Sequence, residues 1–185
     1  MHNILKIFVV FVVTLAMAGC FAPSLQPFFT NENIVFNENL LGGWIKDSGE
    51  KCLFTKSGEN HYELLYVSDG AARFEARLIE LGGATFLDLY PKPLREGNGL
   101  VLANFVPAHT LARVTISKGS ISIELMDGDW LKKLSDQNQL DVAHERLDDE
   151  MVILTAPTRE LQAFTLKHAF TKEAFGEAAV FRRID

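Results

Sequence analysis

Two adjacent glycines, Gly82 and Gly83, constrain the fold of this chain most strongly. From residue 73 to residue 78, charged side chains alternate with apolar ones, which is the period of a β-strand with one face packed and one face in water. Residues 84–90 are again mostly apolar. Because two glycines accept the positive φ angles of a two-residue hairpin turn, the chain is predicted to reverse between these two strands.

Similar patterns run from residue 44 to residue 126. A second hairpin is predicted around Lys118-Gly119, and its inward-facing positions are Ala112, Val114, Ile116, Ile121, Ile123 and Leu125. Earlier strands are expected at 44–47, 52–56 and 61–67, because Ser-Gly and Asp-Gly turn pairs separate them. The sequence therefore predicts an antiparallel meander.

The sequence pattern changes after residue 126. Asp127 and Asp129 are expected to cap a short helix from Trp130 to about Ser135. One more hairpin is predicted over 142–146 and 151–155. Pro157 suits the first turn of a helix that reaches about residue 169, and residues 178–184 are expected to add an edge strand. The fold class predicted is mainly β with some helix (α+β).

The N-terminal region has the pattern of an export signal. Residues 7–19 are almost wholly apolar, too few to span a bilayer, and the run ends in Ala18-Gly19-Cys20. The stretch from Leu15 to Cys20 resembles the lipobox of bacterial lipoproteins. The resemblance implies that residues 1–19 are a removed signal peptide and that Cys20 carries the lipid anchor. The alternative is an ordinary secretory peptide cut near Ala18, with Cys20 an incidental thiol.

The predicted organisation has three parts. Residues 1–19 form the signal peptide, residues 20–39 form a lipidated flexible tether rich in Asn and Pro, and residues 40–185 form a single globular β-rich domain. Phe21 is not the Asp that resembles an inner-membrane retention signal in enteric bacteria. The expected location is therefore the cell envelope, on the periplasmic face of the outer membrane where the organism has one.

A second resemblance concerns the folded part. Gly42-Gly43-Trp44, just before the first predicted strand, resembles the Gly-x-Trp start of lipocalin-like barrels, and the late helix at 157–169 resembles the helix outside such barrels. The resemblance implies a closed barrel that binds an apolar molecule, with Trp44 closing one end. The alternative is an open or sandwich-like sheet covered by helices, since the helix at 130–135 interrupts the order of strands.

Charge and cysteine content limit the partners. The formal charge is −6, and removal of Lys6 with the signal peptide makes it −7, so nucleic-acid binding is not expected. Once Cys20 is acylated, Cys52 is the only thiol, and its apolar neighbours predict a buried side chain.

The chain lacks the sequence motifs of common catalytic and nucleotide-binding sites, and its histidines are scattered singly, so neither a metal nor another cofactor is expected. Asp88 interrupts an apolar strand and either faces water or lines a cavity beside Phe86 and Tyr90. His109 is expected to be an ordinary hydrogen-bonded histidine. The candidate ligand-binding residues are Trp44, Phe86, Asp88, Tyr90 and Trp130, although the tryptophans also suit core positions.

Three functions remain open. The first is a non-enzymatic envelope lipoprotein, anchored to the membrane through Cys20, that binds a small lipid-like ligand. The second is a protein-interaction or structural lipoprotein without a ligand cavity, which an exposed Tyr62 or Tyr66 and a solid core would favour. The third is a hydrolase, which a cluster of Asp88, His109 and a further polar group in a cleft would favour.

Overall fold

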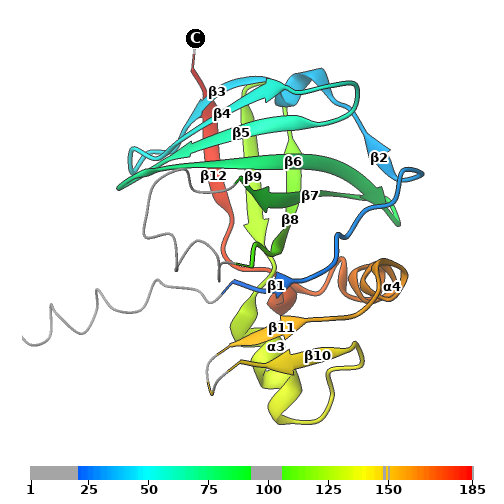
Figure 1. Ribbon diagram of the computed structural model, residues 1–185. Helices are drawn as coiled ribbons and strands as arrows, with labels where there is room; N and C mark the ends of the chain where they lie inside the picture. The colour runs from blue at the N-terminus through cyan, green and yellow to red at the C-terminus, as the bar shows by residue number, and fades with distance from the viewer. Residues whose placement is uncertain (1–20, 93–105, 148, 150, 185) are drawn as a thin grey trace, which may run out of the picture.

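A closed antiparallel barrel forms the larger part of the protein. The computed structural model describes residues 21–92, 106–147, 149 and 151–184. Within them, eight strands follow one another around the barrel, and the last pairs with the first (Figure 1). They are β3 (Gly42–Ile45), β4 (Lys51–Lys56), β5 (Tyr62–Val67), β6 (Ala71–Leu81), β7 (Ala84–Pro91), β8 (His109–Ile116), β9 (Ser120–Leu125) and β12 (Ala179–Arg183). The predicted meander is confirmed, and it is closed and lipocalin-like in shape.

The hairpin that the sequence predicts most clearly sets the register of β6 and β7. Leu81 pairs with Ala84 across the turn, and Gly82 and Gly83 have φ angles of 57° and 80°. A Cβ atom on Gly82 would lie 2.5 Å from Leu166, so glycine also makes room for a neighbouring helix. The apolar side chains of the predicted alternation on β6, Phe74, Ala76 and Leu78, belong to the hydrophobic cluster inside the barrel.

The prediction of an edge strand at 178–184 is wrong in one respect. A strand is present there, but β12 pairs with both β9 and β3 and so closes the barrel. Phe181 on this strand is 3% exposed and faces the interior. Alternation in a sequence shows which side of a strand is buried, but it does not show which strands are its neighbours.

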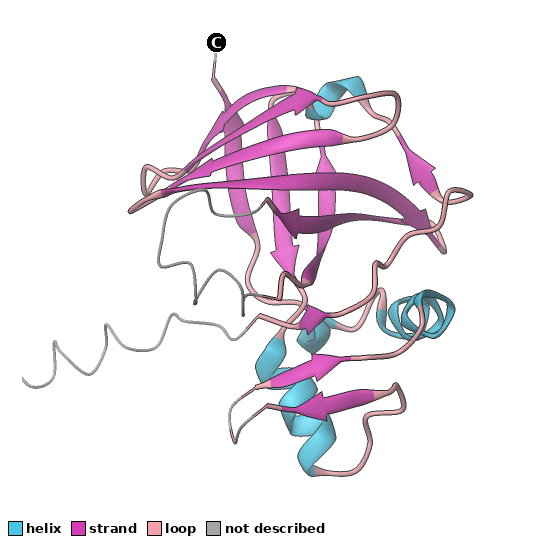
Figure 2. Ribbon diagram, in the orientation of Figure 1, coloured by secondary structure: helices cyan, strands magenta, loops and turns pink. Residues whose placement is uncertain are grey.

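A smaller layer packs against the outside of the barrel. It contains β1 (Pro23–Ser24), β10 (His144–Arg146), β11 (Val152–Leu154), α3 (Gly128–Asp136), α4 (Thr158–His168) and η2 (Lys172–Ala174) (Figures 1 and 2). Both predicted helices are confirmed, and the Asp127 carboxylate caps α3 by accepting a hydrogen bond from the backbone N–H of Trp130. No helix among the described residues has the length and apolar content needed to cross a membrane.

The segment from residue 21 to residue 39 is not the flexible tether that its composition suggests. It contains β1, β2 (Ile34–Val35) and the start of η1 (Glu38–Leu40), and Ala22, Ser24 and Phe28 are each 0% exposed. Isolated anchor residues separated by loops bury this segment, and such anchors have no sequence period. The domain therefore includes residues from 21 onward. Cys20 and the predicted signal peptide lie outside the described residues.

Two hydrophobic clusters stabilise the molecule. One fills the barrel, and the other lies between the barrel's outer face and the smaller layer. Strand β7 contributes to both, because Leu87 and Leu89 face the interior while Phe86 faces the second cluster. A strand that is covered on both faces has a nearly continuous apolar sequence, as residues 84–90 have.

Candidate functional site

The chain before β3 caps one end of the barrel. The indole Nε1–H of Trp44 donates a 2.9 Å hydrogen bond to the carbonyl of Leu40. The Tyr62 hydroxyl accepts a hydrogen bond of 2.7 Å from the backbone N–H of Asn37 and donates one of 3.1 Å to its carbonyl. Phe36 stacks on the Tyr62 ring with 4.8 Å between centroids. These contacts hold the segment across the barrel, and we call this the capped end.

Arg183 completes the capped end from the last strand. Its guanidinium lies 4.3 Å from the centroid of the Trp44 ring. The same group donates hydrogen bonds of 2.9 Å to the carbonyl of Leu41 and 2.6 Å to that of Asn39. One side chain therefore joins the first strand, the last strand and the capping segment. Trp44 lies at a closed end, as the lipocalin-like resemblance implies.

The middle of the barrel is filled by side chains. Its large residues are almost completely inaccessible, and they are Trp44, Phe54, Tyr62, Leu64, Leu78, Leu87, Ile121 and Phe181. Trp44, Tyr62 and Leu87 are 0% exposed, so no water-sized void touches them. An interior of eight strands is just wide enough for side chains to fill, which is the case here. Tyr62 is buried, contrary to the exposure that an interaction role for this residue requires.

The opposite end of the barrel is less completely covered. Partly buried apolar side chains face inward there, and we call this group the rim. It consists of Tyr66, Phe74, Ile123, Leu125 and Ala179. Their positions follow from the register, since Tyr66 pairs with Ala72 near the β5–β6 turn and Ala179 pairs with Ile123. The rim is therefore an apolar part of the interior that is only partly buried.

In the described part of the chain, one hollow lies beside the capped end and another lies on the outside of the barrel. The first, of about 280 Å³, is lined by Val35, Phe36, Asn37, Glu38, Leu78, Glu80, Thr85 and Ile116. Small-molecule sites usually enclose about 300 to 1,000 Å³ and are mostly apolar, so two glutamates and this small size argue against a lipid site.

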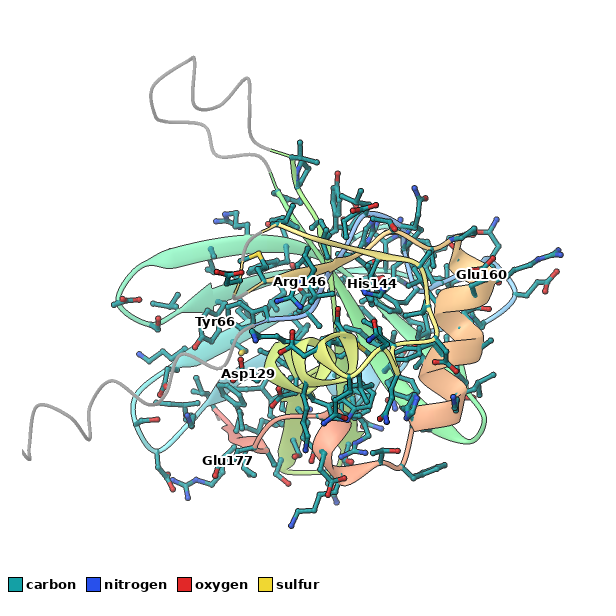
Figure 3. All side chains as sticks on the ribbon, turned by 90° about the horizontal axis from the view of Figure 1, so that it is seen from below. Tyr66, Asp129, His144, Arg146, Glu160 and Glu177 are labelled. Atoms are coloured by element: carbon teal, nitrogen blue, oxygen red, sulfur yellow. The ribbon has the colours of Figure 1, made fainter. Side chains whose placement is uncertain are left out.

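A larger hollow of about 560 Å³ lies outside the barrel beside α3. Basic and acidic side chains both line it, among them Lys133, Lys172 and Asp129. Figure 3 labels Asp129 and Glu177, which belong to this lining and lie on the same side of the molecule. Arg113 is already engaged, because its guanidinium bonds the Glu124 carboxylate and the carbonyl of Ala169. The mixture of charges selects no single class of ligand.

Asp88 is buried on the outer face of β7 and is 1% exposed. Its Oδ2 accepts a 2.9 Å hydrogen bond from the backbone N–H of Phe28, and its Oδ1 lies 2.7 Å from Nδ1 of His109. Of the two placements that the sequence left open, exposure to water is therefore wrong. Phe86 and Tyr90 share its face as expected, but that face lies outside the barrel. The N-terminal segment covers this face, and local alternation could not show that.

The surroundings of the pair favour a structural role. The His109 ring lies 4.5 Å from that of Tyr90 and 6.3 Å from that of Phe29, measured between centroids. Among the described residues, no hydroxyl or thiol side chain forms a hydrogen bond with Asp88 or His109. A hydrolase that forms a covalent intermediate by means of an Asp-His pair needs a side-chain nucleophile beside the histidine. The pair instead ties the N-terminal segment to β7 and β8, and His109 is hydrogen-bonded as predicted.

The five candidate ligand-binding residues do not meet in one site. Trp44 lies inside the capped end, while Phe86, Asp88 and Tyr90 lie on the outer face of β7. Trp130 is on α3, where its ring lies 4.9 Å from that of His168. Of the five, Asp88 and Tyr90 both contact His109.

Sequence reasoning missed Arg183 and Phe28, which hold the capped end and the N-terminal segment. A terminal arginine and a phenylalanine in an aperiodic stretch have no local signal for such roles. No group of three or more His, Cys, Asp or Glu side chains in the described part of the chain is arranged to hold a metal ion.

Comparison with known proteins identifies no relative of this chain. No protein-family model matches the chain, and no curated protein or solved structure matches it.

Proposed function

We propose that this protein is a lipid-anchored, non-enzymatic component of the bacterial cell envelope whose filled barrel is a scaffold for a protein partner. The observation that carries the proposal is the packed interior, in which Trp44, Tyr62 and Leu87 have no exposed surface. A barrel whose middle is filled by side chains leaves its outer surface for contacts with other molecules. The resemblance of Leu15 to Cys20 to a lipobox supports the anchor.

The outer face of β3, β4 and β12 offers an apolar row for such a partner. Leu53 is 41% exposed and pairs with Gly43, whose carbonyl accepts a hydrogen bond from the backbone N–H of Ile184. Ile184 is 45% exposed. Because Gly43 has no side chain, the side chain of Ile184 packs over it, within 3.4 Å of the place of a Cβ atom, and continues the row. An exposed apolar row of this kind suits an apolar patch on another protein.

Photo-cross-linking in living cells tests this proposal. A photoreactive amino acid at Leu53 is expected to give one discrete protein adduct, and Ile184→Asp is expected to abolish it because a charge would be placed in the contact. The matched control is the same photoreactive residue at Glu59, an exposed polar position in the β4–β5 connection. Absence of a protein adduct at Leu53, or an adduct that survives Ile184→Asp, would count against the proposal.

A second candidate function is binding of a small lipid-like molecule at the rim. The partly buried side chains of Tyr66, Phe74 and Leu125 favour it, since they provide inward-facing apolar surface at one end of the barrel. Residues 21–185 purified without detergent from the native organism would retain such a molecule at about one per chain. Phe74→Asp would then reduce its retention, whereas a chain without any apolar molecule, and without a thermal shift from a panel of lipids, contradicts this candidate.

A further inference from the structure

The structure leaves almost no distance between the proposed lipid anchor and the folded domain. Phe21 follows Cys20 directly, Ala22 and Ser24 are each 0% exposed, and β1 is held between β8 and β11. Consecutive Cα atoms are about 3.8 Å apart, so acyl chains on Cys20 would start one residue from packed structure. The domain could not then stand off the membrane on a tether, and one of its faces must lie against the lipid.

The pairing of β1 and β11 identifies that face. The two strands are parallel, with Ser24 beside Leu154, so they begin on the same side of the molecule. Phe21 lies just before β1 and Met151 just before β11, and the backbone N–H of Leu147 bonds the carbonyl of Met151. Figure 1 shows the start of β1 and the start of β11 on one side.

Three large apolar side chains are exposed on this side. Phe21 is 59% exposed, Leu147 is 60% exposed and Met151 is 37% exposed, and we call them the apolar edge. Scattered exposed hydrophobic residues need no explanation, but Phe21 is the next residue after the one that would carry the acyl chains, and Leu147 and Met151 lie on the same side as Phe21. Apolar side chains beside a lipid anchor add to its membrane affinity through burial in the headgroup and acyl boundary.

Resting on the proposed lipid anchor, we propose that the apolar edge inserts into the bilayer that holds Cys20, so that the domain lies directly on the membrane surface. The mature chain is acidic, with a formal charge of −7 once Lys6 is removed, and Asp149 lies in the turn next to the edge. The basic Arg146, which precedes Leu147, is paired with Asp136. Electrostatic attraction to anionic lipid therefore does not contribute, and the contact is apolar. Contact is expected on zwitterionic lipid and is expected to persist at high salt.

An environment-sensitive fluorophore at Leu147→Cys tests the insertion on the full lipidated protein. The protein is reconstituted in vesicles of phosphatidylcholine and phosphatidylethanolamine, some of which carry a nitroxide quencher on an acyl chain. Cys52 is 3% exposed and remains unlabelled in the folded protein. Glu59→Cys is the control, since Glu59 is also exposed and lies in the β4–β5 connection, on the opposite side in Figure 1.

Blue-shifted emission and quenching by the nitroxide lipid are expected at position 147 and not at position 59. Water-like emission at 147 in acylated protein overturns the insertion and leaves the lipid anchor intact. If the fluorophore is shielded from water only in native envelope membranes, and not in vesicles, the apolar edge contacts a protein partner. That outcome also overturns the insertion. Intact mass spectrometry of the same sample reports acylation, so failure of the anchor is recognised separately.

Discussion

The carboxylate of Asp88 accepts a hydrogen bond of 2.9 Å from the backbone N–H of Phe28, 60 residues earlier in the chain. This bond joins a barrel strand to the segment that follows Cys20. The same carboxylate lies 2.7 Å from Nδ1 of His109. A buried carboxylate with two partners is thus one link between the N-terminal segment and the barrel, where the sequence alone leaves open a solvated side chain or a ligand contact.

Asp88→Ala is predicted to lower the free energy of unfolding by about 2 to 4 kcal/mol, because it leaves the Phe28 N–H and His109 without their acceptor in a buried place. Urea unfolding followed by circular dichroism measures the loss. Asp69→Ala, on the exposed β5–β6 turn, is the control and should change stability by less than about 0.5 kcal/mol. Equal stability of the two variants would show that the link does not stabilise the fold.

Arg183→Ala is predicted to cost about 1 to 3 kcal/mol, since it removes the contact with the Trp44 ring and two hydrogen bonds to backbone carbonyls. The neighbouring Arg182 pairs with Asp47, and the two side chains are 67% and 77% exposed. Arg182→Ala should therefore cost less than about 0.5 kcal/mol. Thermal unfolding with tryptophan fluorescence compares the two, and a larger loss from Arg182→Ala would contradict this account of the capped end.

Stability is predicted to fall in mild acid because of His168. Burial beside Trp130 and Phe164 lowers the pKa of His168 below its ordinary value of 6.5, and Lys167 lowers it further while Asp141 opposes the shift. The unfolded chain then takes up the proton at a higher pH than the folded protein does. The contribution of His168 is thus complete above about pH 6.5 and declines as the pH falls towards the lower folded pKa.

Urea unfolding of the native protein and of His168→Gln between about pH 8 and about pH 5 isolates this contribution. The native protein should lose more stability than the variant over this interval. Parallel curves for the two proteins would mean that His168 does not couple folding to pH.

The thiol of Cys52 is predicted not to react with thiol reagents in the folded protein. It is 3% exposed, and burial, with a smaller effect from Glu50, raises the pKa of its thiol to about 12. The thiolate is the reactive form, so a thiol reagent at about pH 8 should label folded Cys20→Ser protein only as fast as it unfolds. Urea should make the reaction rapid, whereas rapid labelling without urea would show that the barrel opens at this point.

The sequence predicts the barrel strands well where a strand has alternation and a turn signal of its own. The β6–β7 hairpin around Gly82 and the β8–β9 hairpin are both present, and so are both helices. Strand β1 has two residues, too few to form a pattern, and it is held by partners more than 80 residues away. The closing role of β12 also depends on distant partners, so no local signal predicts it.

The candidate site was less predictable than the fold. Asp88, Phe86 and Tyr90 do share a face of β7, as alternation predicts, but alternation does not distinguish the inside of a barrel from a covered outside. The N-terminal segment, whose composition suggests a tether, supplies that cover. The prediction of a flexible tether before the domain therefore explains why the position of Asp88, under this segment on the outer face of β7, was not foreseen.

Native mass spectrometry of the mature protein, extracted from its own membranes in mild detergent, tests the central claim most directly. The account predicts a chain that starts at an acylated Cys20 and carries no additional apolar molecule. An unmodified chain would contradict the lipid anchor, and an apolar molecule retained at one per chain would contradict the filled scaffold.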